Sequence, residues 1–188
     1  MAIVSAAAGC GHKNDSAPTT TPTTSSTQTA STPKTMTEYD FAESVKDQAS
    51  SACTSAEGAT LPNQGTISGQ SVVMKKDIGK GYYPSFDMYG LPLATSAAMF
   101  KSLVCIDVKR VSMGTYVDQG GNTTSADRRD WDVAVLSWPA GDLIAQGHFQ
   151  GGDPPNTCSA TTTDRSACQG SEPTTAARDW VKTVITPS

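Results

Sequence analysis

The segment 131-WDVAVLSWPAGDLIAQGHF-149 decides how this chain folds. Its first part alternates between two sets of side chains, which predicts a strand with one heavier face. Residues 139–142, Pro-Ala-Gly-Asp, predict a tight turn, and Leu143 to Phe149 then returns as a second strand. Two prolines at 154 and 155 cannot continue a ladder of hydrogen bonds, so the strand ends before them. The segment therefore predicts a β-hairpin.

Other periodic segments surround this hairpin. Residues 67–75 and 104–111 contain runs of apolar residues that predict two further strands. The intervening residues 79–92 are rich in Gly, Tyr and Pro and are expected to be an ordered loop. Residues 118–130 are polar and are expected to form the loop of a second hairpin.

Three helices are expected. Thr37 with Asp40 forms a capping signal, and the apolar residues that follow recur at a spacing of four. Residues 95–101 predict a short internal helix, and Pro173 precedes a C-terminal one. Its buried face is expected to contain Ala176, Ala177, Trp180, Val181 and Val184. The predicted fold class is α+β, with a mainly antiparallel sheet, an N-terminal helix, a short internal helix and a C-terminal helix.

The first part of the chain has a different composition. Residues 11–35 consist mostly of Thr, Ser and Pro and contain no aromatic or branched aliphatic residue. Such a segment cannot bury enough surface to offset its ordering entropy, so it is expected to be disordered. We therefore expect a signal segment at 1–10, a disordered tether at 11–36 and a single globular domain at 37–188.

Residues 7–10, Ala-Ala-Gly-Cys, close a short apolar segment at the start of the chain. They resemble the lipobox of bacterial lipoproteins, in which small residues precede a cysteine that is lipidated. The resemblance implies a lipid on Cys10 and a location on the extracytoplasmic side of a bacterial cell membrane. The basic residues of that pattern are missing before the apolar run, since the first lysine is Lys13. The signal segment is therefore expected to be truncated.

The cysteines fit an exported protein. With Cys10 set aside for lipid, an even number remains, which allows three pairings that the sequence does not distinguish. Cys158 and Cys168 bracket a short polar loop and are the natural local pair, which leaves Cys53 with Cys105. There is no CxxC motif, and no metal or cofactor is expected. The net charge of -4 and the absence of a basic cluster argue against nucleic acid as a partner.

Two places in the predicted domain carry candidate chemistry. His148 lies in the second hairpin strand and would serve as a general base only if folding brings a nucleophile to it. The segment with Tyr82, Tyr83, Phe86 and Tyr89 is a candidate binding surface, because aromatic side chains give a large contact area at small entropic cost. The same aromatic side chains could instead fold down as a lid on the core.

Residues 91–181 resemble a recurring bacterial domain of unassigned role. The residues that carry the resemblance are Val111, Gly114, Tyr116, Trp131, Asp132, Val133, Trp138, Gly141, Ile144, Ala145, Phe149, Gly151, Gly152, Asp153, Pro154, Pro155, Gly170, Ser171, Pro173 and Trp180. The resemblance implies a small exported or membrane-associated domain. The segment between Cys158 and Cys168 departs from that pattern as an insertion.

Together these features predict a lipid-anchored, extracytoplasmic binding or interaction module of the bacterial cell envelope without catalysis. Its expected partners are the membrane, through Cys10, and an envelope protein, a peptide or a glycan. Two alternatives stay open: an envelope hydrolase that uses His148, and a structural or stress-related envelope protein.

Overall fold

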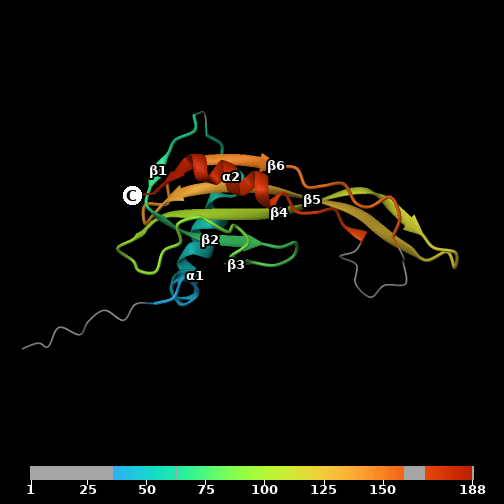
Figure 1. Ribbon diagram of the computed structural model, residues 1–188, viewed down its shortest axis with the longest axis horizontal. Coiled ribbons are helices and arrows are strands. Elements are labelled where there is room, and N and C mark those ends of the chain that lie inside the picture. Colours follow the sequence, from blue (N-terminus) through green and yellow to red (C-terminus); the bar gives the residue numbers. More distant parts are fainter. Residues whose placement is uncertain (1–35, 62, 159–167, 188) are drawn as a thin grey trace, which may run out of the picture. The chain divides into compact units, whose positions relative to one another are not determined.

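A mixed β-sheet forms the centre of the fold (Figure 1). The computed structural model describes residues 36–61, 63–158 and 168–187, so Cys10 and the predicted signal and tether segments, apart from Met36, lie outside them. Within the described residues, five strands form this sheet in the order β3-β2-β4-β5-β6, and β1 pairs with β7 separately. The elements are α1 (Glu38–Ala56), β1 (Ile67–Ser68), β2 (Gln70–Lys76), β3 (Tyr82–Pro84), β4 (Phe100–Val117), β5 (Thr123–Ser137), β6 (Leu143–Phe149), α2 (Thr174–Val184) and β7 (Ile185–Thr186).

The sheet is mixed, because β2 and β4 run parallel. The chain leaves β2, turns back as β3 on its outer edge, and then returns to the start of β2 before β4 begins. A hydrogen bond from Ala94 N to Ser71 O holds this return. The remaining pairs of neighbours, β2–β3, β4–β5 and β5–β6, are antiparallel, and the predicted hairpin 131–149 is present as the last of them.

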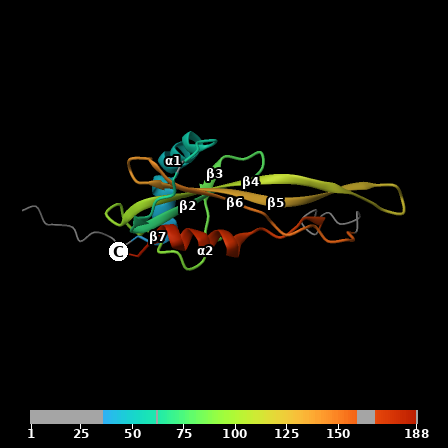
Figure 2. The ribbon, with the colours of Figure 1, turned by 90° about the horizontal axis from the view of Figure 1, so that it is seen from above.

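Each face of the sheet carries one of the two helices (Figure 2). Side chains alternate along a strand, so neighbouring residues of β4 belong to different cores. Leu103 and Cys105 pack with Phe41, Ala49 and Cys53 of α1. On the other face, the core contains Val104, Ile106, Trp131, Val133, Val135, Ala177, Val181 and Val184.

The N-terminal helix begins where the capping signal predicts. Asp40 N donates to Thr37 Oγ1 over 3.1 Å, and Phe41 N donates to the Thr37 carbonyl. Near its other end, a disulfide joins Cys53 to Cys105 of β4, with 5.5 Å between the Cα atoms. The second disulfide joins Cys158 to Cys168. Neither described helix is long and apolar enough to cross a membrane.

The internal helix predicted at 95–101 is wrong. Residues 97–99 form a single turn, in which Met99 N and Phe100 N both donate to Ser96 O. The helix stops there because Phe100 already begins β4 and pairs with Gln70. The loop predicted at 79–92 likewise contains a strand, β3.

The hairpin loop predicted at 118–130 is also much shorter in the structure. Only residues 118–122 form the turn, and Thr123 already pairs with Val117. From there β4 and β5 pair with each other as a long two-stranded ribbon beyond the ends of β2 and β6 (Figure 1). The ribbon has largely polar faces, so the alternation of buried side chains that marks a strand is missing from its sequence.

The C-terminal helix is present and buries Ala177, Val181 and Val184. Trp180 is half-buried. Ala176 is exposed, so its prediction as part of the buried face was wrong. The spacing of three and four residues is that of a single helix face.

Candidate functional site

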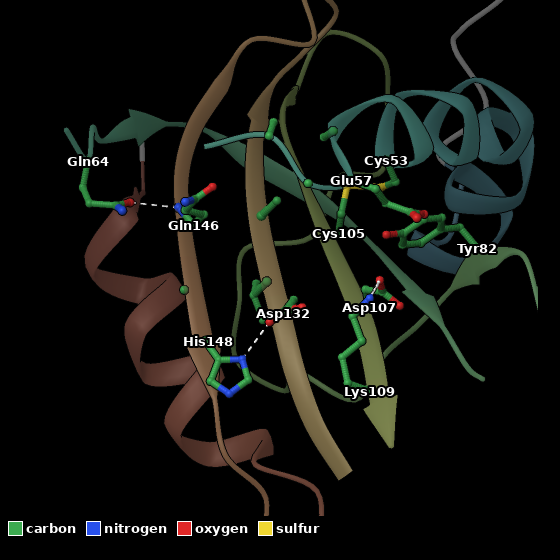
Figure 3. A pocket seen from close by; sticks show the side chains of 16 residues that line it. Cys53, Glu57, Gln64, Tyr82, Cys105, Asp107, Lys109, Asp132, Gln146 and His148 are labelled. Atoms are coloured by element: carbon green, nitrogen blue, oxygen red, sulfur yellow. Dashed lines mark hydrogen bonds and ion pairs between the residues drawn. A yellow bond between two sulfur atoms is a disulfide. The ribbon is translucent and has the colours of Figure 1, made fainter. Parts of the chain in front are cut away.

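A cavity of about 430 Å³ opens on the face of the sheet that α1 covers, beside the end of this helix (Figure 3). We call it the polar cavity. Its floor comes from β4, β5 and β6, and its wall comes from the end of α1 and from β3. Its polar lining includes the side chains of Glu57, Tyr82, Asp107, Lys109, Asp132 and His148.

The register of the strands explains why these side chains meet. Cys105, Asp107 and Lys109 alternate along β4 on the α1 face, and Asp132 and Ala134 lie on the same face of β5. Asp132 lies opposite His148 in the pairing of β5 with β6. The helix ends at Ala56, so the polar part of this face stays open.

His148 and Asp132 form a hydrogen-bonded pair at the mouth of the cavity. His148 Nδ1 lies 2.7 Å from Asp132 Oδ1, and both side chains are at least half exposed. His148 Nε2 also lies 3.8 Å from Oδ2 of Asp130. The imidazole is therefore held between two carboxylates on one strand.

Asp130 provides a fixed negative charge behind this pair. The residue is 2% exposed and accepts a hydrogen bond of 2.9 Å from Gly151 N. Arg128 donates to both of its carboxylate oxygens, over 2.9 and 3.0 Å. The hydrogen bond from Arg128 lowers the pKa of Asp130, so this carboxylate is charged at neutral pH.

Two lysines form further ion pairs around the cavity. Lys109 Nζ donates to Asp107 Oδ2, and this hydrogen bond raises the pKa of Lys109. Lys76 Nζ donates to Glu57 Oε1 over 2.8 Å. Each of these lysines is therefore paired with a carboxylate of the cavity lining.

Tyr82 contributes a hydroxyl from the wall. Its residue is 6% exposed, and Figure 3 shows the ring beside Glu57 with its hydroxyl turned toward the cavity. Burial raises the pKa of Tyr82, and the negative charges of Asp107 and Glu57 add to the effect. The hydroxyl therefore stays protonated at neutral pH and can donate a hydrogen bond.

The segment that follows α1 is hydrogen-bonded to β6 at the edge of the cavity. Gln146 N donates to Gln64 Oε1 and Gly65 N donates to Ile144 O, both over 2.8 Å. In the described part of the chain, no group of three His, Cys, Asp or Glu side chains is placed to hold a metal ion.

The structure separates the four aromatic residues of the predicted binding surface. Tyr82 is buried, Tyr83 and Phe86 are half-buried, and Tyr89 is 78% exposed. Phe86 packs against the α1 core, with its ring 5.9 Å from that of Tyr39. These side chains therefore do not form one exposed aromatic face, and Tyr82 joins His148 in the polar cavity instead.

Sequence reasoning did not single out Glu57, Asp107 or Lys109. The available signal was the polar end of an apolar alternation: Cys105 is followed two and four residues later by Asp107 and Lys109. Such a pattern indicates that the cover over this face of the strand has ended.

No protein-family model matches the chain, and no curated protein matches its sequence. Among solved structures, the chain is similar to a crystal structure described as protein XCC0632 from Xanthomonas campestris, family-model DUF330. The similarity covers 67% of this chain and 90% of that chain, with 13% sequence identity and a TM-score of 0.28. Similarity at this level assigns neither a family nor an activity to the chain.

Proposed function

We propose that this chain is an extracytoplasmic binding module, held at a bacterial membrane by a lipid on Cys10, which takes a polar ligand in the polar cavity without chemical conversion. The two disulfides support the location, because disulfides persist in oxidising compartments outside the cytoplasm. The lipobox resemblance of residues 7–10 supports the anchor.

The polar cavity is the observation that carries the binding function. Its volume of about 430 Å³ lies in the range of small-molecule sites. Its lining offers donors and acceptors in fixed positions, because hydrogen bonds pair Lys109 with Asp107 and His148 with Asp132. A glycan or a peptide, free or as part of an envelope protein, has the hydroxyl and amide groups to match them.

The lining residues favour binding over hydrolysis. They include neither serine nor threonine, and both of their cysteines, Cys53 and Cys105, are joined to each other. A His–Asp pair needs a nucleophile within hydrogen-bond reach to begin covalent catalysis. The alternative of a hydrolase rests on the 2.7 Å contact between His148 and Asp132, which would then activate water.

A nuclear magnetic resonance titration tests the binding function. The probe is a muramidase digest of bacterial cell wall, which contains soluble glycans and peptides, added to the ¹⁵N-labelled chain carrying Cys10→Ser. We expect shifts of the amide signals of Gln146, His148 and Asp132, which Asp132→Asn and Lys109→Met abolish. Lys101→Met is the control, since Lys101 is exposed on the same strand and outside the cavity. Unchanged amide signals, or equal shifts in the cavity variants, would contradict the proposal.

The same titration separates the alternatives. New products that appear with the wild-type chain and not with His148→Ala would support the hydrolase. A chain whose signals stay unchanged in every digest would support the structural role. The anchor is tested independently by mass spectrometry of the protein from its native host, where an unmodified Cys10 overturns it.

A further inference from the structure

A second hollow lies along α1, next to the polar cavity. Its volume is about 770 Å³, and we call it the apolar groove. One wall carries small side chains of the helix, and the other carries the turn between β5 and β6. Its apolar lining includes Ala52, Trp138, Pro139 and Leu143, and the exposed polar residues of the helix that line it are Asp47, Gln48, Ser51 and Ser55.

The two hollows share part of their lining. Ala56, the last residue of α1, and Ala59, in the segment that follows, line both of them. Both residues have methyl side chains, so little bulk stands at the junction. A ligand long enough to pass them would contact both hollows.

The apolar groove offers contact with hydrocarbon and few hydrogen bonds. The ring of Trp138 is stacked on Phe100 at 4.5 Å between centroids, which fixes this wall. The backbone N–H groups of Ser137, Trp138 and Gly141 already have partners. Pro139 has no N–H, and the N–H groups of the helix are used within it. The wall formed by the turn between β5 and β6 therefore offers a peptide backbone few N–H partners, whereas an alkyl chain needs none.

The polar cavity has the opposite character and favours a neutral group. Its lysine, Lys109, is paired with Asp107, and His148 is hydrogen-bonded to Asp132. Lys76, which lies outside the lining, is paired with Glu57. A charged ligand group would have to compete with one of these pairs. Hydroxyl groups both donate and accept, so a polyol can bond to both members of a pair without separating them.

We infer that the two hollows bind one neutral amphiphile, with a polyol head group in the polar cavity and a hydrocarbon chain in the apolar groove. This inference rests on the proposed binding function and names the chemical class of its ligand. The chain leaves the polar cavity past Ala56 and Ala59 and lies against Trp138 and Leu143.

Calorimetric titration with synthetic amphiphiles tests the inference. Decyl maltoside, kept below its micelle concentration, is compared with maltose, which has the head alone. We expect decyl maltoside to bind about tenfold tighter or more, because several methylene groups leave water. Decyl sulfate and decyltrimethylammonium carry the same chain on charged heads and are expected to bind at least about tenfold more weakly than decyl maltoside.

Variants assign each part of the ligand to its hollow. Ser55→Trp fills the apolar groove, and Ala59→Trp blocks the junction; both should reduce decyl maltoside binding to the level of maltose. Thr54→Trp is the matched control, since Thr54 is exposed on the same helix outside the groove. Lys109→Met should weaken maltose and decyl maltoside alike. Thermal unfolding of each variant verifies that it is folded.

The outcomes are distinct. Equal affinity for maltose and decyl maltoside, or full binding by Ser55→Trp, overturns the amphiphile inference and leaves the cell-wall titration of the polar cavity to decide the proposed function. Tighter binding of a charged head overturns the neutral head group. If no amphiphile binds while cell-wall fragments shift the cavity signals, the inference is wrong and the binding function stands.

Discussion

His148 Nδ1 lies 2.7 Å from Asp132 Oδ1, and the two residues face each other across neighbouring strands. The pair joins β5 to β6 at the mouth of the polar cavity. Because both side chains are at least half exposed, water competes for each of them, and the pair contributes little to folding.

Replacing His148 by Ala is expected to lower the free energy of unfolding by less than about 1 kcal/mol, as for exposed ion pairs. Ligand affinity should fall by much more, since a donor at the cavity mouth is lost. Urea denaturation measures the change in stability, and titration with the muramidase digest of cell wall measures the change in affinity. Asp179→Asn, which alters an exposed pair on α2, is the control and should leave both quantities unchanged. A large loss of stability in His148→Ala would show that the pair is structural.

Asp130→Ala is expected to lower the free energy of unfolding by about 1–3 kcal/mol at neutral pH, because it leaves the buried Gly151 N–H without its acceptor. The pKa of Asp130 is lowered in the folded protein by Arg128. The stability that this carboxylate contributes is therefore present above its ordinary value near 3.8 and is lost as the pH falls through the lowered value. The difference between wild type and variant, measured by urea denaturation, should shrink only in strongly acidic solution. A difference that grows toward acid pH would contradict this account.

Removing the disulfide by Cys53→Ala with Cys105→Ala is expected to lower the free energy of unfolding by about 4 kcal/mol, from the entropy of closing a loop with a sequence separation of 52. The comparison is Cys158→Ala with Cys168→Ala, whose separation of 10 predicts about 3 kcal/mol. Denaturant titrations of both variants give the order. A larger loss from the shorter loop would rule out loop entropy as the main effect.

Thr37→Ala removes the cap of α1 and is expected to lower the free energy of unfolding by about 1 kcal/mol, because Asp40 N loses its acceptor. Thr54→Ala is the matched control, since its hydroxyl only donates to the carbonyl of Ser50 within the helix. Thermal unfolding distinguishes the two. Equal melting temperatures for Thr37→Ala and wild type would contradict the capping role.

Local signals made much of the fold predictable. The 131–149 hairpin and the start of the first helix follow from alternation and from a cap, which depend on residues close in sequence. The parallel pairing of β2 with β4 was missed because it depends on where the chain returns after β3, and no short segment encodes that path. The ribbon of β4 and β5 was missed because a strand with polar faces has the composition of a loop.

The candidate site was less predictable than the fold. His148 and Tyr82 were singled out separately, as a base and as part of an aromatic surface. His148 is on β6 and Tyr82 is on β3, at opposite edges of the sheet. Both line one cavity, because α1 ends there and leaves this face of the sheet uncovered. Asp107 and Lys109 line the cavity because this helix stops before it covers them.

Cys53 stands in the wall of the polar cavity, and Cys105 stands in its floor. The bond between them therefore fixes the spacing of wall and floor covalently, and it forms only where thiols are oxidised. A newly made chain in a reducing compartment lacks this link. Under the proposed function, the cavity reaches its binding-competent geometry only after this oxidation, so a chain that is still reduced would not capture ligand.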